Sequence, residues 1–198
     1  MNVAIVFNHP YEGSYCSAML GAVTRGLGRA GHSVDLLHLD RDGFDPVMKA
    51  ADLAAFRAKA AIDPQVLAYQ ERIARADHLV FIFPIWWELM PALTKGFIDK
   101  VIFPGVAYDY TNDKNSLMRP LWTNLGGVTI LTTMNTPGWL YALVFGNAIK
   151  KALVWGTFRK MGYRNVSWLG FDRVKEVPKT KRERWLQEVE ARFAKLGA

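Results

Sequence analysis

The chain has 198 residues, of which 51% are hydrophobic and 13% aromatic, and its formal net charge is +7. These values exclude an intrinsically disordered chain and suit one well-buried domain, which we expect to span residues 1–198. The single cysteine, Cys16, excludes an internal disulfide, and the N-terminus is typical of a first strand and not of a signal peptide, so a cytoplasmic location is expected.

Apolar periodicity predicts strands that alternate with helices. The predicted strands, in chain order, are residues 3–7, 33–39, 79–83, 127–133 and 165–169. The predicted helices are residues 15–30, 50–59, 64–76, 91–102, 140–160 and 180–196, and a polar, tyrosine-bearing loop is expected over residues 105–120. Right-handed crossovers between such strands imply an α/β fold with helices on both faces of a parallel sheet. We predict a flavodoxin-like three-layer sandwich with five strands in the order 2-1-3-4-5.

The longest apolar stretch and the positive net charge do not indicate a membrane-spanning or a nucleic-acid-binding protein. Residues 138–158 contain Asn147, Lys150 and Lys151, whose polarity makes a membrane span unfavourable. The basic residues are scattered except over residues 175–184, and no nucleic-acid motif is present. A solvated basic helix face is the favoured interpretation, and attraction of an anionic cofactor is the alternative.

Two tryptophans follow the third predicted strand. Pro84 ends this strand, and Trp86 and Trp87 precede the next helix. Loops of this kind lie at the carboxyl edge of a parallel sheet, where open α/β folds bind ligands. Large rings there indicate a flat ligand, although tryptophan is also enriched in core caps and subunit interfaces.

The loop after the first strand lacks the glycine spacing of a dinucleotide-binding turn or a Walker loop. It leads into a helix at which Ser14 and Ser17 are available, and free amides at a helix start bind phosphate. Ser14 is equally explained as a helix N-cap. His9 either contacts a phosphate or hydrogen-bonds within its own loop.

Hydroxyl and amide side chains end the fourth predicted strand, at Thr132, Thr133, Asn135 and Thr136. In the predicted strand order the first, third and fourth strands are neighbours, so their following loops converge. An anion site, a tryptophan wall and a polar strand end around one crevice suit a flat ring with a phosphate tail. A flavin is the natural candidate.

With these features the chain resembles the NAD(P)H dehydrogenase (quinone) family, two-electron quinone reductases with a flavodoxin-like fold. The group includes mammalian quinone reductases and bacterial drug-activity modulator proteins. The resemblance covers most of the chain and rests on His9 with residues 14–17, on residues 44–46, on Phe83-Pro84 with Trp87, on residues 91–92, 95–97 and 107–110, and on Thr132-Thr133.

The resemblance implies a bound flavin, FAD or FMN, with NAD(P)H as co-substrate, a quinone-like acceptor, and a homodimer with sites at its interface. The cofactor-binding residues that it implies are His9, Ser14, Tyr15, Cys16 and Ser17 near the phosphates, Pro84, Ile85, Trp86, Trp87 and Glu88 along the ring, and Thr132, Thr133, Met134 and Asn135 at its pyrimidine side. No metal, membrane insertion or nucleic acid is expected.

Three tyrosines are the catalytic candidates that the resemblance implies. Tyr108 and Tyr110 match tyrosines that roof the partner subunit's substrate pocket, and interface packing is the alternative. Tyr141 or its neighbour in the sequence is the nearest match to a tyrosine that pairs with a histidine beside the reduced flavin. No histidine follows His78, so that relay is absent or replaced.

The expected function is therefore that of a flavin-dependent NAD(P)H:acceptor oxidoreductase, which reduces quinones or similar electrophiles by two electrons in a ping-pong hydride transfer. The alternative is a flavin-binding electron carrier or a regulatory subunit with little turnover of its own.

Overall fold

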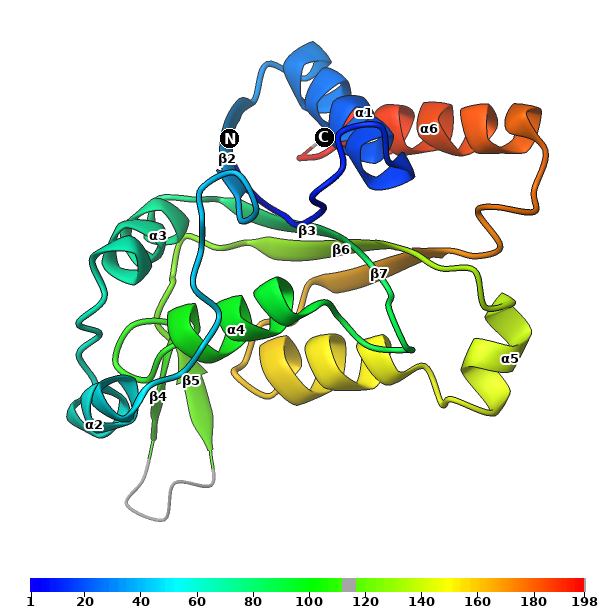
Figure 1. The fold of residues 1–198 in the computed structure, drawn as a ribbon. Helices are drawn as coiled ribbons and strands as arrows, with labels where there is room; N and C mark the ends of the chain where they lie inside the picture. Colours follow the sequence, from blue (N-terminus) through cyan, green and yellow to red (C-terminus); the bar gives the residue numbers. More distant parts are fainter. Residues whose placement is uncertain (112–116, 198) are drawn as a thin grey trace.

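The computed structural model describes residues 1–111 and 117–197 and has three layers (Figure 1). Its central sheet is parallel, with the strand order β2-β1-β3-β6-β7. This order confirms the predicted 2-1-3-4-5 arrangement. The strands are β1 Asn2–Phe7, β2 Ser33–His38, β3 His78–Pro84, β6 Gly127–Thr133 and β7 Val166–Phe171.

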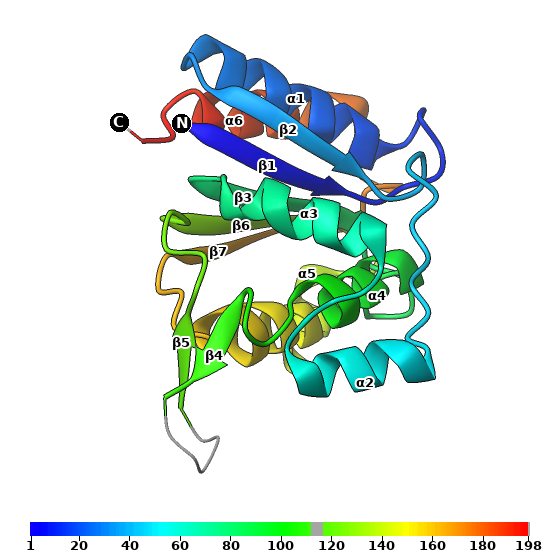
Figure 2. The ribbon, with the colours of Figure 1, turned by 90° about the vertical axis from the view of Figure 1, so that its left-hand side faces the viewer.

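Helices cover both faces of the sheet (Figure 2). One face carries α1 Tyr15–Arg29 and α6 Lys179–Phe193. The opposite face carries α3 Pro64–Ala74, α4 Ala92–Val101 and η1 Lys150–Arg159, with α2 Ala50–Ala58 and α5 Gly138–Leu143 at the margins of that layer.

The sequence of strand β3 is apolar without interruption because both faces of the strand are buried. Successive side chains of a strand point to opposite faces, and here both faces are covered. Leu79, Phe81 and Phe83 pack in the core beneath α3, α4 and η1. Val80 and Ile82 pack in the core beneath α1 and α6.

The predicted helix over residues 140–160 is wrong in one respect, because the structure divides it into α5 and the π-helix η1. Gly146 and Asn147 separate the two, with φ values of +63° and +53°. Glycine takes this left-handed conformation without steric cost, and asparagine tolerates it better than most residues. Apolar periodicity runs through the break and does not reveal it.

The polar loop predicted over residues 105–120 contains two short antiparallel strands, β4 Tyr108–Tyr110 and β5 Met118–Pro120. Strands of three residues are too short to show an alternating pattern. Residues 112–116 of that loop, and residue 198 of the predicted domain, lie outside the described residues. Within the described ranges, each helix is too short or too polar to cross a membrane.

Candidate functional site

The carboxyl ends of β1, β3 and β6 meet at a cavity of about 500 Å³. Small-molecule sites of roughly 300–1,000 Å³ are usual in proteins. Predicted site residues that line this cavity are His9, Tyr15, Pro84, Ile85, Trp86, Thr133, Met134 and Asn135. The structure thus brings together members of all three groups that the sequence indicated, from segments more than 100 residues apart.

The loop after β1 ends in a helix cap. The Ser14 side chain accepts a hydrogen bond from the Ser17 amide at 3.1 Å, and the two hydroxyls lie 2.9 Å apart. The capping role of Ser14 is therefore present, while its contact with a phosphate stays a prediction. The first turn of α1 contains no acidic residue, so its amides present an uncompensated positive dipole end.

Cys16 connects this loop to the end of β6. Its Sγ lies 3.3 Å from Thr133 Oγ1, and the residue is 1% exposed. Desolvation by burial raises the pKa of the thiol to about 11. Since the thiolate is the reactive form of cysteine, this shift makes Cys16 a poor nucleophile, and its place near a phosphate stays a prediction.

The loop after β3 contains a tight two-residue turn. Trp86 N donates to Leu89 O at 2.9 Å, and Leu89 N donates to Trp86 O at 3.1 Å. The two central residues, Trp87 and Glu88, have φ values of +49° and +63°. This is the pattern of a type I′ turn, which normally selects Asn-Gly. Each of these side chains costs about 1–2 kcal/mol in the left-handed region.

Contacts from the β6–α5 side hold the strained turn in place. Thr136 Oγ1 donates to Glu88 Oε1 at 2.6 Å, and the Tyr141 hydroxyl donates to Glu88 O at 3.0 Å. The same hydroxyl accepts a hydrogen bond from Ile149 N at 3.0 Å. Burial raises the pKa of Tyr141, which keeps it a neutral donor. Its hydroxyl therefore positions the turn, and its predicted part in catalysis remains untested.

The two tryptophans point in different directions. Trp86 lines the cavity, and its ring centroid lies 6.1 Å from that of His9 in an edge-on arrangement. Trp87 is 98% exposed, and its ring projects from the tip of the turn. Within one chain the cavity wall is therefore Trp86 and not Trp87, although the family resemblance rests on Trp87. Contact of Trp87 with a ligand stays a prediction.

Two backbone amides beside the carboxyl ends of β3 and β6 already have hydrogen-bond partners. Met134 N donates to Phe171 O at 2.9 Å, and Ile85 N donates to Thr133 O at 2.7 Å. Thr132 is fully buried, and its hydroxyl accepts a hydrogen bond from Trp168 Nε1 at 2.9 Å. Both amides and the Thr132 hydroxyl thus support the wall, which leaves Asn135 as the polar group best placed to face a ligand.

Tyr108 and Tyr110 lie on the β4–β5 hairpin and do not line this cavity. Their rings pack edge to face with centroids 5.8 Å apart. Burial raises the pKa of Tyr108 to about 12, so the hydroxyl is neutral at physiological pH. A part for these tyrosines at a site on a second subunit stays a prediction.

Val174, Lys175 and Arg182 also line the cavity, and the sequence did not identify them. The Tyr15 hydroxyl donates to Arg182 O at 2.7 Å, and Arg182 Nη1 donates to Val174 O at 3.3 Å. Two cationic side chains thus line the same cavity as Tyr15, the first residue of α1. Their signal in the sequence is the basic stretch over residues 175–184, for which a solvated helix face is the favoured interpretation and attraction of an anionic cofactor the alternative.

The charged side chains that line the cavity are those of Lys175 and Arg182, and both favour an anion. Desolvation by burial lowers the pKa of His9, more than the nearby carboxylate of Asp40 raises it. Within residues 1–111 and 117–197, no group of three histidine, cysteine or acidic residues is arranged to hold a metal ion.

Comparison with known proteins agrees with this geometry. A family model described as "Flavodoxin-like fold" matches residues 1–196. Among solved structures, the NAD(P)H:quinone oxidoreductase from Methanothermobacter marburgensis superposes with a TM-score of 0.87 at 26% identity, over 99% of this chain and 98% of that one.

Two relatives match part of the chain. NAD(P)H dehydrogenase [quinone] 1 of Cavia porcellus is 29% identical over an alignment of 122 positions, which covers 54% of this chain and 44% of the relative. The uncharacterized NAD(P)H oxidoreductase YcaK of Escherichia coli K12 is 31% identical over 107 residues, which are 54% of this chain and 55% of the relative. The matches thus span about half the length of these relatives.

Proposed function

The chain belongs to the flavodoxin-like fold family, and from that premise we propose that it is a flavin-dependent NAD(P)H:acceptor oxidoreductase that reduces quinones or similar electrophiles. The observation that carries the proposal is the cavity at the ends of β1, β3 and β6, where an aromatic wall, a helix start and two cations meet. The names of the quinone-reductase relatives support the choice of reaction.

The lining fits a flavin in three respects. The start of α1 and the side chains of Lys175 and Arg182 suit a phosphate. Trp86 offers an aromatic wall to a flat ring, and Asn135 offers a polar group to the ring's edge. The volume of about 500 Å³ agrees with a ligand of this class, FAD or FMN.

A bound flavin would supply the two-electron chemistry, in which hydride arrives from NAD(P)H and leaves to the acceptor in alternate half-reactions. The residues of the chain bind and orient. Lys175, Arg182 and the α1 amides hold the phosphate end, and the rigid turn at residues 86–89 holds the wall. Burial of the ring between these groups excludes water from the reacting face.

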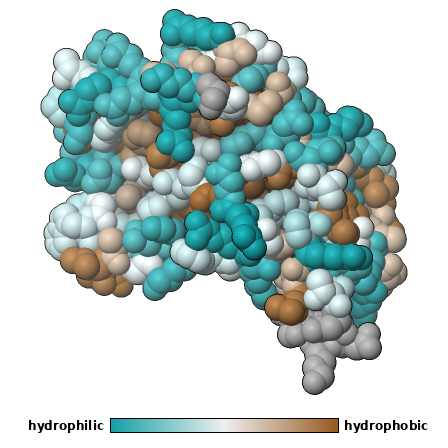
Figure 3. All heavy atoms as spheres, turned by 180° about the vertical axis from the view of Figure 1, so that it is seen from behind, coloured by the Kyte–Doolittle hydropathy of each residue, from teal (hydrophilic) through white to brown (hydrophobic). Residues whose placement is uncertain are grey.

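We further propose that the protein works as a cytoplasmic homodimer. Trp87, Trp139 and Leu143 are 98%, 66% and 80% exposed, and Trp87 adjoins Trp86 of the proposed site. Figure 3 shows brown hydrophobic atoms at the margin where α5 lies, and further brown atoms elsewhere on the same face. Exposed apolar groups gathered in this way are typical of an interface. The buried, unpaired Cys16 is consistent with a reducing compartment.

The purified protein tests the main proposal. We expect a yellow protein whose flavin absorbance bleaches when NADPH or NADH is added without oxygen and recovers when a quinone is added. Mass measurement of the extracted cofactor distinguishes FAD from FMN. A colourless protein that neither flavin reconstitutes contradicts the proposal. Bound flavin with negligible NAD(P)H oxidation would instead identify an electron carrier or a regulatory subunit.

A further inference from the structure

The two outer strands of the central sheet are β2 and β7, and each has a lateral edge that no further strand of the sheet covers (Figure 2). The backbone N–H and C=O groups on such an edge readily pair with another extended chain. Proteins therefore usually cover or block the lateral edges of their sheets. The proposed flavin-binding role uses neither of these two edges.

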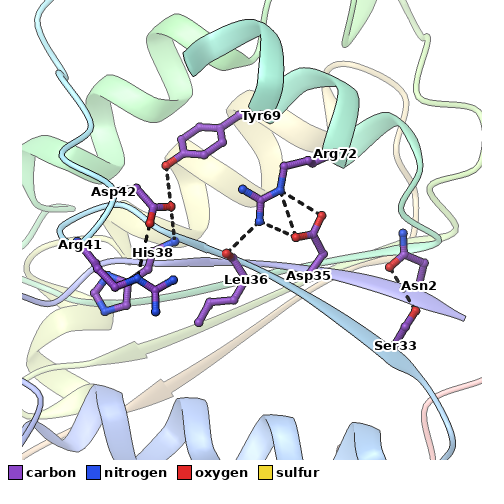
Figure 4. A network of polar contacts seen from close by, with 9 residues as sticks. All are labelled: Asn2, Ser33, Asp35, Leu36, His38, Arg41, Asp42, Tyr69 and Arg72. Atoms are coloured by element: carbon purple, nitrogen blue, oxygen red, sulfur yellow. Dashed lines mark hydrogen bonds and ion pairs between the residues drawn. The ribbon is translucent and has the colours of Figure 1, made fainter. Parts of the chain in front are cut away.

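Side chains close the lateral edge of β2 (Figure 4). Odd-numbered residues of β2 hydrogen-bond to the β1 side, so the backbone of the even-numbered residues faces outward. Arg72 Nη2 donates to Leu36 O at 2.8 Å, and His38 N donates to Asp42 Oδ2 at 3.1 Å. The Tyr69 hydroxyl also donates to Asp42 Oδ2, at 3.0 Å, and fixes that carboxylate. These outward backbone groups are already bonded and cannot pair with an added strand.

The lateral edge of β7 is open by comparison. Met134 N donates to Phe171 O at 2.9 Å, and the regular parallel register makes the odd-numbered residues of β7 the partners of β6. The backbone groups of Trp168 and Gly170 therefore face outward. Within the described part of the chain, no side chain or further backbone group hydrogen-bonds to them. Both residues thus offer an N–H and a C=O group to an added strand.

A cavity of about 550 Å³ lies along this open edge, between β7 and α6. Trp168 lines it from one face of the sheet, and Trp168 Nε1 donates to Thr132 Oγ1 at 2.9 Å, which fixes the ring. A Cβ added at Gly170 would come within 2.8 Å of this ring, so glycine leaves the room that the ring occupies. From the other face, the rings of Phe171 and Trp185 pack edge to face with centroids 5.4 Å apart. The outward backbone therefore lies between aromatic walls.

Two cations line the cavity at its two ends. Lys181 Nζ lies 5.0 Å from the centroid of the Trp185 ring, and Arg192 Nη2 donates to Ser167 Oγ at 3.4 Å. Within residues 1–111 and 117–197, neither cation forms an ion pair with a carboxylate. Eleven positions along α6 separate them by about 16 Å, which is roughly the length of five residues of extended chain.

Two carboxylates also line the cavity, and groups outside it compensate each of them. Asp172 Oδ2 accepts a hydrogen bond from Gly138 N at 2.7 Å and lies 3.5 Å from Arg173 Nε. Glu188 Oε1 lies 3.4 Å from Arg184 Nε. An acidic ligand therefore meets two uncompensated cations and two carboxylates whose charge is balanced.

The segments that flank β7 are basic as well. Residues 150–164, which include η1, carry five cationic side chains and no acidic one. Helix α6 carries five cationic side chains and three acidic ones. A second copy that paired its β7 with this β7 around a twofold axis would bring the two α6 helices side by side and their like charges together. Charge complementarity therefore favours an acidic partner over a second copy.

We propose that the lateral edge of β7 receives an extended, acidic segment of another protein, which adds a strand to the central sheet. The backbone of the segment pairs with Trp168 and Gly170, and its apolar side chains contact the aromatic walls. Acidic side chains near its two ends meet Lys181 and Arg192. This inference adds a partner to the protein and does not rest on the proposed flavin chemistry.

The binding test uses the purified protein with the cofactor that it retains. It is titrated with a rhodamine-labelled, seven-residue peptide that has glutamate at both ends and alternating valine and threonine between them, and anisotropy measures the affinity. We expect the double variant Lys181→Gln with Arg192→Gln to bind roughly tenfold more weakly than the wild type. Lys179→Gln with Lys195→Gln removes two exposed cations outside the cavity and should bind as the wild type does. Equal affinity in all three proteins, or no binding to the wild type, overturns the proposal.

Hydrogen exchange measured by NMR separates strand addition from charge attraction. We expect saturating peptide to slow exchange of the Trp168 and Gly170 amides by roughly tenfold or more. The Leu169 amide, which faces β6, is the internal control and should change little. Peptide binding that leaves the two outward amides unprotected identifies charge attraction alone and overturns the proposal. Protection that rises with protein concentration in the absence of peptide identifies a second copy as the occupant and also overturns it.

Discussion

The two edges of the central sheet are built differently. At the amino edge, short connections at residues 30–32 and 75–77 lead directly into β2 and β3. His78 Nε2 lies 2.9 Å from Thr129 Oγ1 there, and Ser167 Oγ donates to the same hydroxyl at 3.3 Å. At the carboxyl edge, the loops over residues 8–14 and 85–91 are longer and surround two cavities.

Strain is also concentrated at the carboxyl edge. Trp87 and Glu88 adopt positive φ values in the turn after β3, and Trp87 is almost fully exposed. The buried groups at the amino edge, by contrast, pair with one another. The difference indicates that the contacts at the amino edge stabilise the fold. The strained backbone at the carboxyl edge lowers stability but forms a defined binding surface. Each of the following predictions tests one side of that division.

The largest expected effect is at the amino edge and depends on pH. Desolvation by burial, reinforced by the charge of Arg192, lowers the pKa of His78 from 6.5 to about 4. Between these two pKa values, His78 is therefore protonated in the unfolded chain and neutral in the folded chain. The stability from neutral His78 is complete above pH 6.5 and decreases as the pH falls towards 4, by about 3 kcal/mol in total.

Urea denaturation of wild type and His78→Gln at pH 7.5, 5.5 and 4 measures this contribution. Other groups also titrate in this range, so the difference between the two proteins is the quantity of interest. We expect that difference to change steadily over the series. Parallel loss of stability in the two proteins contradicts the assignment of His78 to the stabilising edge.

The second effect concerns the support of the strained turn. Tyr141→Phe removes the hydroxyl between Glu88 O and Ile149 N, and Tyr141 and Ile149 are both fully buried. Leaving these backbone groups without a partner is expected to lower the free energy of unfolding by about 2 kcal/mol. Tyr11→Phe, at a residue that is 68% exposed, is the control and should change it little. Equal stability of both variants in urea denaturation would show that the turn needs no such support.

The third effect measures the strain itself. Trp87→Gly and Trp87→Ala both remove the exposed ring, but only glycine relieves the positive φ. We expect the glycine variant to be about 1 kcal/mol more stable than the alanine variant, because alanine retains the left-handed penalty. Both should lose flavin retention or turnover equally if the ring serves the site. Thermal unfolding measures the difference in stability, and absorbance measures the flavin that each variant retains. Equal stability of the glycine and alanine variants would show that the backbone at residue 87 is not strained.

The smallest effect on stability is expected at the start of α1. Ser14→Asn and Ser14→Asp both preserve a capping side chain, so we expect their stabilities to agree within about 0.5 kcal/mol. The aspartate variant places a negative charge where the phosphate is proposed, and it should retain much less flavin than the asparagine variant. Absorbance of the purified variants measures the flavin that each one retains. Equal flavin content in the two variants would show that the phosphate does not bind beside Ser14.

The sequence by itself determined the alternation of strands and helices, the order of the sheet and the convergence of three loops. Hydrophobic periodicity is local, and parallel sheets with right-handed crossovers allow few arrangements. His9, Pro84 and Thr133 could therefore be placed at one edge from the strands that precede them. The π-helix and its break at Gly146 could not be predicted, because the apolar pattern continues through them.

Only the tertiary structure decided which side chains face the cavity. Trp86 lines it and Trp87 does not, because Trp87 lies at the tip of a turn with positive φ values. Contacts from Thr136 and Tyr141 stabilise that turn. Arg182 reaches the site from a helix at the opposite end of the chain. These features depend on contacts between residues distant in sequence, whose energies a local pattern does not contain.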